Sequence, residues 1–225
     1  MNRKLTELLD KLEYEQVCGK TEREITAVVY DSRKVIPGCL FICINGANFD
    51  GHDFAAQVAA QGAGVLVVQK DIEFPADADV TVIKVADTRY AMAFISAAWF
   101  GHPAEKLKVI GITGTKGKTT TTYLVKSILE NAGYKVGLVG TIEVIIGDEH
   151  IHANNTTPES YLLQEYFARM VDAGLDTVVM EVSSQGLMMH RTAGIPFEIG
   201  IFTNLAPDHI GPNEHASFEE YAACK

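Results

Sequence analysis

Hydrophobic and polar positions alternate along this chain in blocks whose period switches between that of a strand and that of a helix. Short apolar runs rich in β-branched residues predict strands, over 25–30, 39–44, 65–68 and 80–85. Apolar residues at helical spacing predict helices, over 1–16, 53–61 and 88–100. The alternation of the two kinds of element predicts a small N-terminal α/β domain.

The pattern restarts after a break at Gly101-His102-Pro103, so we expect a first domain over 1–101 and a second over 102–225. Further apolar runs predict strands, over 107–112, 135–139, 141–146, 177–182 and 199–203. Helical spacing predicts more helices, over 119–131, over 160–173 and from Ser217 onward. The second domain is expected to be a mostly parallel, doubly wound α/β domain. It has fewer strands than such sheets usually have, so we expect it to be incomplete.

Composition and charge narrow the classes of partner. The chain has 225 residues, of which 47% are hydrophobic and 21% charged, as in ordinary soluble globular proteins. Its 19 basic and 29 acidic residues give a formal net charge of −10, which disfavours nucleic acid and anionic membranes as partners. Its four cysteines form no Cys-x-x-Cys pair, and no stretch is long and apolar enough to cross a bilayer. We therefore expect a cytoplasmic protein with reduced thiols, no nucleic-acid partner and no membrane insertion.

The strongest chemical signal is Gly-Thr-Lys-Gly-Lys-Thr at 114–119, between a predicted strand and a predicted helix. Gly and Thr also form ordinary turns, but Gly-Lys-Thr at a helix start is typical of a loop whose N–H groups bind phosphate. Lys118 can neutralise the β- and γ-phosphates, and the Thr119 hydroxyl can bind Mg²⁺. The longer form of this pattern requires glycine where Ile112 stands, so the spacing is the shorter one. The residues expected to bind ATP are Gly114, Thr115, Lys116, Gly117, Lys118, Thr119 and Thr120.

Three further polar clusters follow predicted strands, at the edge where open α/β sheets bind ligands. The run 154–158 can hydrogen-bond a polar substrate, or can simply cap the helix that follows. Glu181 ends an apolar strand, where a P-loop protein often places a carboxylate near Mg²⁺; the alternative is a solvent-facing strand end. His209 can bind a metal through its neutral imidazole, although a loop histidine is more often a surface residue. Lys225 on its own is typical of a solvated helix lysine.

These motifs occur in a fixed order over nearly the whole chain. They are Gly-Thr-Lys-Gly-Lys-Thr-Thr-Thr (114–121), Asn-Thr-Thr-Pro (155–158), Glu-Val-Ser-Ser-x-Gly-Leu (181–187), Asn-Leu-x-x-Asp-His (204–209) and Tyr-Ala-x-Cys-Lys (221–225). The N-terminal runs 31–33, 37–41 and 50–54 add to the match. The set resembles the Mur ligase family, and within it the branch that adds the third residue of the peptidoglycan stem peptide.

The resemblance implies a three-domain enzyme, of which this chain would supply the UDP-binding N-terminal domain (1–101) and about half of the central ATPase domain (102–225). It implies an ATP-dependent amide ligase of peptidoglycan and cell-wall synthesis that uses ATP and Mg²⁺. The γ-phosphoryl group of ATP would pass to a carboxylate of UDP-N-acetylmuramoyl-L-Ala-D-Glu. The amine of an amino acid would then displace phosphate from the acyl phosphate. Meso-diaminopimelate and lysine both stay open as that amino acid, and we expect a monomer.

The resemblance also implies roles for single residues. Lys118, His209 and Lys225 would be catalytic. Thr119 and Glu181 would hold one Mg²⁺, and His209 would help to hold another. Lys225 matches the family's carbamylated lysine, in which CO₂ on the neutral amine makes an anionic oxygen ligand for the metal; this requires a lowered lysine pKa. The residues that would bind the UDP-substrate are Tyr30, Ser32, Asn155, Thr156, Thr157, Ser183 and Arg191.

Other functional classes stay open on the sequence alone. One is another ligase of the same superfamily, of folylpolyglutamate or cyanophycin type, against which the N-terminal run 31–33 argues. A second is a nucleotide-binding module without turnover. A P-loop GTPase is disfavoured because no Asn-Lys-x-Asp motif follows the loop. The chain departs from the family pattern at Met189, where a polar Gln is common, and at Gln185, where His is frequent.

Overall fold

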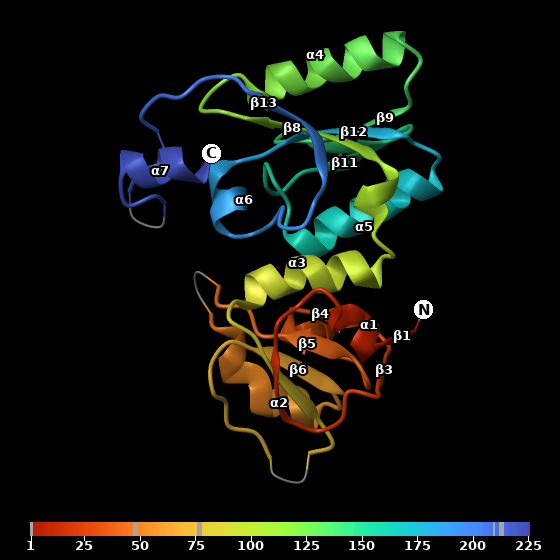
Figure 1. The fold of residues 1–225 in the computed structure, drawn as a ribbon, viewed down its shortest axis with the longest axis vertical. Helices are drawn as coiled ribbons and strands as arrows, with labels where there is room; N and C mark the ends of the chain where they lie inside the picture. The colour runs from red at the N-terminus through yellow and green to blue at the C-terminus, as the bar shows by residue number, and fades with distance from the viewer. Residues whose placement is uncertain (1, 47–48, 76–77, 209, 212–213) are drawn as a thin grey trace. The chain divides into compact units, whose positions relative to one another are not determined.

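The chain folds into two compact units, Met1–Trp99 and Phe100–Lys225, in the computed structural model (Figure 1). The structure describes residues 2–46, 49–75, 78–208, 210–211 and 214–225. Each unit is considered by itself, with its own sheet and its own buried core. Within the described residues, no helix has the length and apolar content that crossing a membrane requires.

The first unit is built on a five-stranded sheet in the order β2-β7-β6-β5-β4. Neighbouring strands are parallel except that β2 runs antiparallel to β7 at one edge. Strands β5 and β6 are buried along their whole length, as in parallel sheets covered on both faces. The elements in chain order are β1 (Arg3–Lys4), α1 (Leu5–Leu9), β2 (Glu15–Cys18), β3 (Glu24–Ile25), β4 (Val28–Val29), η1 (Ser32–Lys34), β5 (Leu40–Ile42), η2 (Gly51–Phe54), α2 (Ala55–Ala60), β6 (Val65–Val68), β7 (Thr81–Lys84) and α3 (Thr88–Trp99).

The N-terminal helix is shorter than the predicted span 1–16. Only Leu5–Leu9 is helical, and Glu15–Cys18 is instead strand β2, paired with β7. The prediction is wrong beyond Leu9 because pairing along the sheet edge outweighs the helical spacing of a few leucines. The predicted strand 25–30 is likewise divided into the short strands β3 and β4.

The second unit is built on a six-stranded sheet in the order β11-β10-β9-β12-β8-β13. Strands β9, β12, β8 and β13 are parallel, and the hairpin β10–β11 is antiparallel at one edge. The expected α/β class with a mostly parallel sheet is therefore confirmed. The elements are η3 (Pro103–Lys106), β8 (Lys108–Thr113), α4 (Lys118–Asn131), β9 (Val136–Val139), β10 (Glu143–Ile146), β11 (Glu149–His152), α5 (Ser160–Asp172), β12 (Thr177–Glu181), α6 (Ser184–Met188), β13 (Phe197–Phe202) and α7 (Phe218–Cys224).

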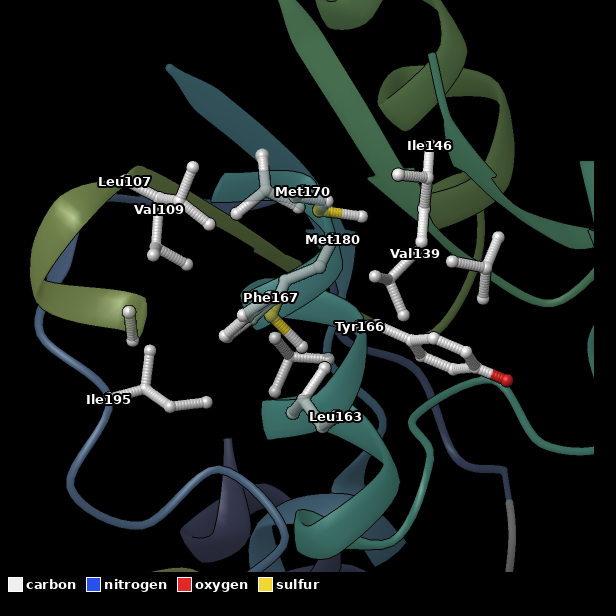
Figure 2. Close-up of a cluster of buried hydrophobic side chains, with 14 residues drawn as sticks. Leu107, Val109, Val139, Ile146, Leu163, Tyr166, Phe167, Met170, Met180 and Ile195 are labelled. Atoms are coloured by element: carbon white, nitrogen blue, oxygen red, sulfur yellow. The ribbon is translucent and has the colours of Figure 1, made fainter. Parts of the chain in front are cut away.

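Helices cover both faces of this sheet, α4 on one face and α5 on the other (Figure 1). On the α5 face, Leu163, Phe167 and Met170 lie in one buried cluster with Met180 of β12 (Figure 2). Burying each such side chain contributes roughly 1.5–3 kcal/mol. The other face carries a smaller cluster that includes Ile110 of β8. The two clusters fix the sheet between its helices.

The carboxyl ends of the parallel strands lie together at one edge of the sheet. The register places Glu181 of β12 beside Ile112 of β8, and Phe202 of β13 beside Thr113. Strand β9, which ends at Val139, pairs with β12 on its other side. The segments that follow these strands therefore leave the sheet at the edge where open α/β sheets bind ligands.

Candidate functional site

The loop between β8 and α4 turns through two glycines in the left-handed region. Gly114 has φ of +138° and Gly117 has φ of +83°, which side chains disfavour. A Cβ on Gly114 would lie 2.0 Å from Oγ1 of Thr203, so a larger residue does not fit there. Helix α4 begins at Lys118, and the N–H groups of a first helical turn have no helical acceptor. Such a helix start favours an anion such as phosphate.

This loop is held in place by the segment that follows β13. The N–H of Thr115 donates to the carbonyl of Asn204 at 2.9 Å, and the N–H of Lys116 donates to Oδ1 of Asn204 at 3.0 Å. Tyr221 of α7 donates to Oγ1 of Thr115 at 2.9 Å, and that hydroxyl donates to the carbonyl of Ala206 at 3.1 Å. Because these two loop amides are bonded within the protein, a phosphate at this loop would depend on the N–H groups at the start of α4.

Two lysine ammonium groups reach the same loop. Nζ of Lys118 donates to the carbonyls of Gly114 and Thr115 at 2.8 and 3.0 Å. Nζ of Lys225 donates to the Gly114 carbonyl at 2.9 Å and lies 4.9 Å from the centroid of the Tyr221 ring. Burial, together with the charge of Lys118, lowers the pKa of Lys225 to about 8. Burial also lowers the pKa of Lys118, although neighbouring carboxylates act in the opposite direction.

A buried carboxylate stands beside the loop. Glu181 is 1% exposed, and its Oε2 accepts a hydrogen bond from Oγ1 of Thr119 at 2.9 Å. Thr141, which follows β9, donates to both carboxylate oxygens, from its N–H at 2.9 Å and from its hydroxyl at 3.1 Å. Mg²⁺ commonly binds one or two protein carboxylates together with phosphate oxygens and water. The carboxylate of Glu181 and the hydroxyl oxygen of Thr119 are metal ligands of this kind. Among the described residues, no three His, Cys, Asp or Glu side chains gather as a metal site.

A cavity of about 290 Å³ lies next to these groups in the second unit. It brings together residues that the sequence assigns to the nucleotide and to the substrate, and its wall includes Lys118, Thr141, Asn154, Asn155, Thr156, Ser183, Ser184, Gln185, Arg191, Glu214, His215 and Lys225. Five predicted positions from three separate parts of the sequence, at 155–156, 183–191 and 225, thus share one cavity with the P-loop lysine. The lining residues are all of polar or charged type, which suits a charged, hydrogen-bonding ligand.

Two of the predicted substrate residues are already bonded within the protein. The hydroxyl of Thr157 is fully buried, donates to the carbonyl of Glu181 at 3.1 Å and accepts from the N–H of Ser183 at 3.0 Å. The guanidinium of Arg191 donates to the carbonyl of Thr157 at 3.0 Å and to Oε1 of Glu159 at 2.7 Å. These bonds tie the segment before α5 to the segment after β12, so both residues shape the cavity wall.

Three other predicted residues belong to the other unit or lie outside the described residues. Tyr30 and Ser32 belong to the unit Met1–Trp99, directly after β4. Ser32 opens the turn η1, whose preceding Asp31 accepts from the N–H of Arg33 at 3.1 Å. Hydrogen bonds from Arg33 lower the pKa of Asp31 to about 2. His209 lies outside the described residues.

The structure adds residues that the sequence does not single out. Gly140 directly follows β9, and Thr141 comes next. A glycine and a hydroxyl residue at the end of a strand are a local pattern from which Thr141 could have been predicted. His215 is fully buried, and its Nδ1 lies 4.0 Å from Sγ of Cys224. Its ring packs edge-on against the ring of Tyr221 at 5.3 Å between centroids. His215 precedes α7, and it contacts Tyr221 and Cys224 of that helix at the wall of the cavity.

Comparison with known proteins matches both units of the chain to family models. Residues 112–225 match the model described as Mur ligase middle domain, and residues 24–100 match the model described as Mur ligase family, catalytic domain. Among curated relatives, the UDP-N-acetylmuramoyl-L-alanyl-D-glutamate--2,6-diaminopimelate ligase of Clostridium perfringens is 48% identical over 221 residues, which are 98% of this chain and 45% of the relative. The ligase of the same name from Bacillus licheniformis is 46% identical, over 99% of this chain and 44% of the relative.

Solved structures share the fold. A structure of UDP-N-acetylmuramoyl-L-alanyl-D-glutamate--2,6-diaminopimelate ligase superposes with a TM-score of 0.81 at 24% identity, over 100% of this chain and 44% of that chain. A crystal structure of MurF from Acinetobacter baumannii superposes with a TM-score of 0.60 at 23% identity, over 100% of this chain and 45% of that chain. The chain spans less than half the length of the curated relatives it matches.

Proposed function

This chain belongs to the Mur ligase family, and on that premise we propose that the protein carrying it is an ATP-dependent ligase of peptidoglycan synthesis. It joins an amino acid to UDP-N-acetylmuramoyl-L-Ala-D-Glu by an amide bond. We propose 2,6-diaminopimelate as the amino acid, since the relatives in Clostridium perfringens and Bacillus licheniformis are named for it. The observation that carries the proposal is the single cavity that Lys118 shares with Asn155, Ser183 and Arg191.

The reaction has two steps that these residues can support. A carboxylate oxygen of the dipeptide attacks the γ-phosphorus of ATP, the bond to the β,γ-bridging oxygen breaks, and ADP leaves. The amine of the amino acid then attacks the acyl carbon; the C–N bond forms, phosphate leaves and the amine loses a proton. Phosphoryl transfer between anions depends on positioning and charge neutralisation. Lys118 and the first-turn N–H groups of α4 hold the phosphates, and Asn155, Thr156 and Ser183 orient the dipeptide.

The residues beside the phosphate loop are suited to hold the metal ion of this reaction. The family uses ATP and Mg²⁺, and Thr119 and Glu181 are the residues that would hold the ion. When bound, Mg²⁺ neutralises negative charge on the phosphates. His209 stays a predicted ligand on the sequence alone.

Lys225 has the properties that carbamylation requires. Its amine lies at the loop, 2.9 Å from the Gly114 carbonyl, and its lowered pKa of about 8 gives a substantial neutral fraction near neutral pH. We propose that the neutral nitrogen adds to CO₂ with loss of one proton. The product is an anionic group in place of a cation, able to offer oxygen atoms to Mg²⁺.

The remaining assignments extend this proposal. Tyr30 and Ser32 would contact the uridine diphosphate, and Thr157 would act through Ser183, to which it is hydrogen-bonded. ATP and a UDP-linked precursor are cytoplasmic metabolites, which supports the cytoplasm as the compartment. We keep the monomer as the expected state.

The test is ATP hydrolysis that requires both UDP-N-acetylmuramoyl-L-Ala-D-Glu and 2,6-diaminopimelate, measured in the protein that carries this chain, with lysine as the competing amino acid. Lys118→Ala should abolish phosphoryl transfer and leave binding of the UDP-substrate, measured by calorimetry, largely intact. Lys135→Ala, at an exposed lysine before β9, is the matched control and should turn over normally. Hydrolysis that is indifferent to the UDP-substrate, or a fully active Lys118→Ala, would contradict the proposal.

A further inference from the structure

We propose that Thr141 is a positioning residue that connects the magnesium-binding carboxylate to the substrate-binding segment, so that the two sites are coupled. The inference rests on the proposed function, because it assigns Glu181 to the metal and Thr156 to the UDP-substrate. Oγ1 of Thr141 lies 3.1 Å from Oε2 of Glu181 and 3.0 Å from Oγ1 of Thr156. A single hydroxyl therefore contacts one residue of each site.

The proton on each hydroxyl gives this chain of contacts a direction. A carboxylate oxygen only accepts, so the one hydroxyl proton of Thr141 is donated to Glu181. Oγ1 of Thr141 then has only lone pairs for Thr156, which must donate its own proton to Thr141. Thr156, in the cavity wall, is left to accept a hydrogen bond from a ligand. The arrangement thus selects a donor on the substrate, such as an amide N–H.

The backbone around Thr141 is built to hold the carboxylate. The N–H of Thr141 donates to Oε1 of Glu181 at 2.9 Å, so this one residue contacts both carboxylate oxygens. A Cβ on Gly140 would lie 2.6 Å from Oε1, so the close approach of carboxylate to backbone requires glycine there. The N–H of Gly140 donates to the carbonyl of Glu143 at 3.1 Å, which fixes the turn into β10.

Coupling follows because both sites act on the same hydroxyl. The second hydrogen bond to Oε2 of Glu181 comes from Thr119, at the start of α4. An ion held by Glu181 and Thr119 would draw charge from the carboxylate, and this alters the hydrogen bond that Oε2 accepts from Thr141 and, through that hydroxyl, the one that Thr141 accepts from Thr156. A ligand at Thr156 acts on Glu181 by the same route, as reciprocal linkage requires.

The experiment measures binding of Mn²⁺, as a paramagnetic probe, by electron paramagnetic resonance with a non-hydrolysable ATP analogue, with and without UDP-N-acetylmuramoyl-L-Ala-D-Glu. Thr141→Val removes the hydroxyl at nearly constant volume, and Thr141→Ser restores it. We expect Thr141→Val to raise the Kd for Mn²⁺ about tenfold, as for loss of one hydrogen bond to a charged group. It should also abolish the effect of the UDP-substrate on that Kd, and Thr141→Ser should recover both.

Thr156→Val gives an independent arm that leaves the contacts to Glu181 in place. With the UDP-substrate at a concentration that saturates this variant, the coupling should be lost although Thr141 still bonds to Glu181. Unchanged Mn²⁺ affinity and unchanged coupling in Thr141→Val would overturn the proposal, as would a Thr141→Ser variant no better than Thr141→Val. Failure of the parent protein to bind the UDP-substrate would instead contradict the proposed function, and the Mn²⁺ affinity of Thr141→Val would still decide whether Thr141 positions Glu181.

Discussion

Lys118 and Lys225 donate hydrogen bonds to the same oxygen, the carbonyl of Gly114, at 2.8 and 2.9 Å. Two ammonium groups on one acceptor repel each other, and the repulsion adds to the cost of burying Lys225. The pKa of Lys225 falls to about 8 as a result, with burial as the larger cause. The P-loop lysine therefore helps to keep its neighbour partly neutral.

Removing the charge of Lys118 should raise the pKa of Lys225. In Lys118→Met the repulsion disappears while most of the burial remains, so the pKa should move up from about 8 without reaching the usual lysine value. The sign follows because a like charge disfavours the protonated form, and its removal favours that form. The measurement is an NMR titration of the labelled Lys225 side chain as the free amine, in buffer without CO₂, with Lys135→Met as a control that should not shift it. An unchanged titration in Lys118→Met would show that the two ammonium groups do not interact.

The fold was predictable where apolar periodicity is long or uninterrupted. The buried strands 65–68 and 177–181 and helix α5 lie within a residue of their predicted bounds, since their sequences offer the backbone no alternative. The failures are short elements whose structure depends on tertiary pairing. Strand β2 forms only against β7, and β11 carries mostly polar residues in its pairing with β10. Such edge strands have little local signal.

The residues of the candidate site also fall into those that the sequence could predict and those that it could not. Gly114 and Glu181 could be found from sequence because a phosphate loop and a strand-end carboxylate have local patterns. His215 and the contact of Lys225 with the loop could not, since each depends on where α7 packs. Residue types also do not show which polar side chains form hydrogen bonds within the protein. The buried hydroxyl of Thr157 bonds to the protein itself, which only the arrangement of β12 and the segment before α5 reveals.

A carbamate on Lys225 makes a prediction about chemical rescue. Lys225→Ala removes both the amine and the proposed anionic ligand of the Mg²⁺ that would neutralise charge in the transition state, so ligase activity should fall by at least about a hundredfold. Formate or acetate at high concentration should restore part of it by supplying a carboxylate in the space left. Chloride at equal ionic strength is the control and should restore nothing. Full activity of Lys225→Ala without added carboxylate would rule out the carbamate.

The glycine that opens the phosphate loop should tolerate no side chain. In Gly114→Ala the new Cβ meets Oγ1 of Thr203 at 2.0 Å, and φ of +138° is itself strained for alanine. The substitution should destabilise the protein by at least about 1–3 kcal/mol and should weaken nucleotide binding. Gly147→Ala is the matched control, since Gly147 also has positive φ, +60°, but nothing lies within 4 Å of its Cβ. Its cost should be about 1–2 kcal/mol, with nucleotide binding intact. Thermal melts and calorimetric titration with ADP separate the two variants.

Arg191 offers the sharpest test of the substrate side of the cavity. Its planar guanidinium bridges the carbonyl of Thr157 and the carboxylate of Glu159, at 3.0 and 2.7 Å, which the single ammonium of a lysine cannot reproduce. Arg191→Lys should therefore loosen the wall that carries Ser183 and raise KM for the UDP-substrate about tenfold. KM for ATP should change little, because the phosphate loop is held instead by Asn204. Arg169→Lys, at a surface ion pair with Glu149, is the matched control and should leave both KM values unaltered. Equal effects of Arg191→Lys on the two KM values would show that Arg191 stabilises the protein as a whole and does not specifically shape the substrate wall.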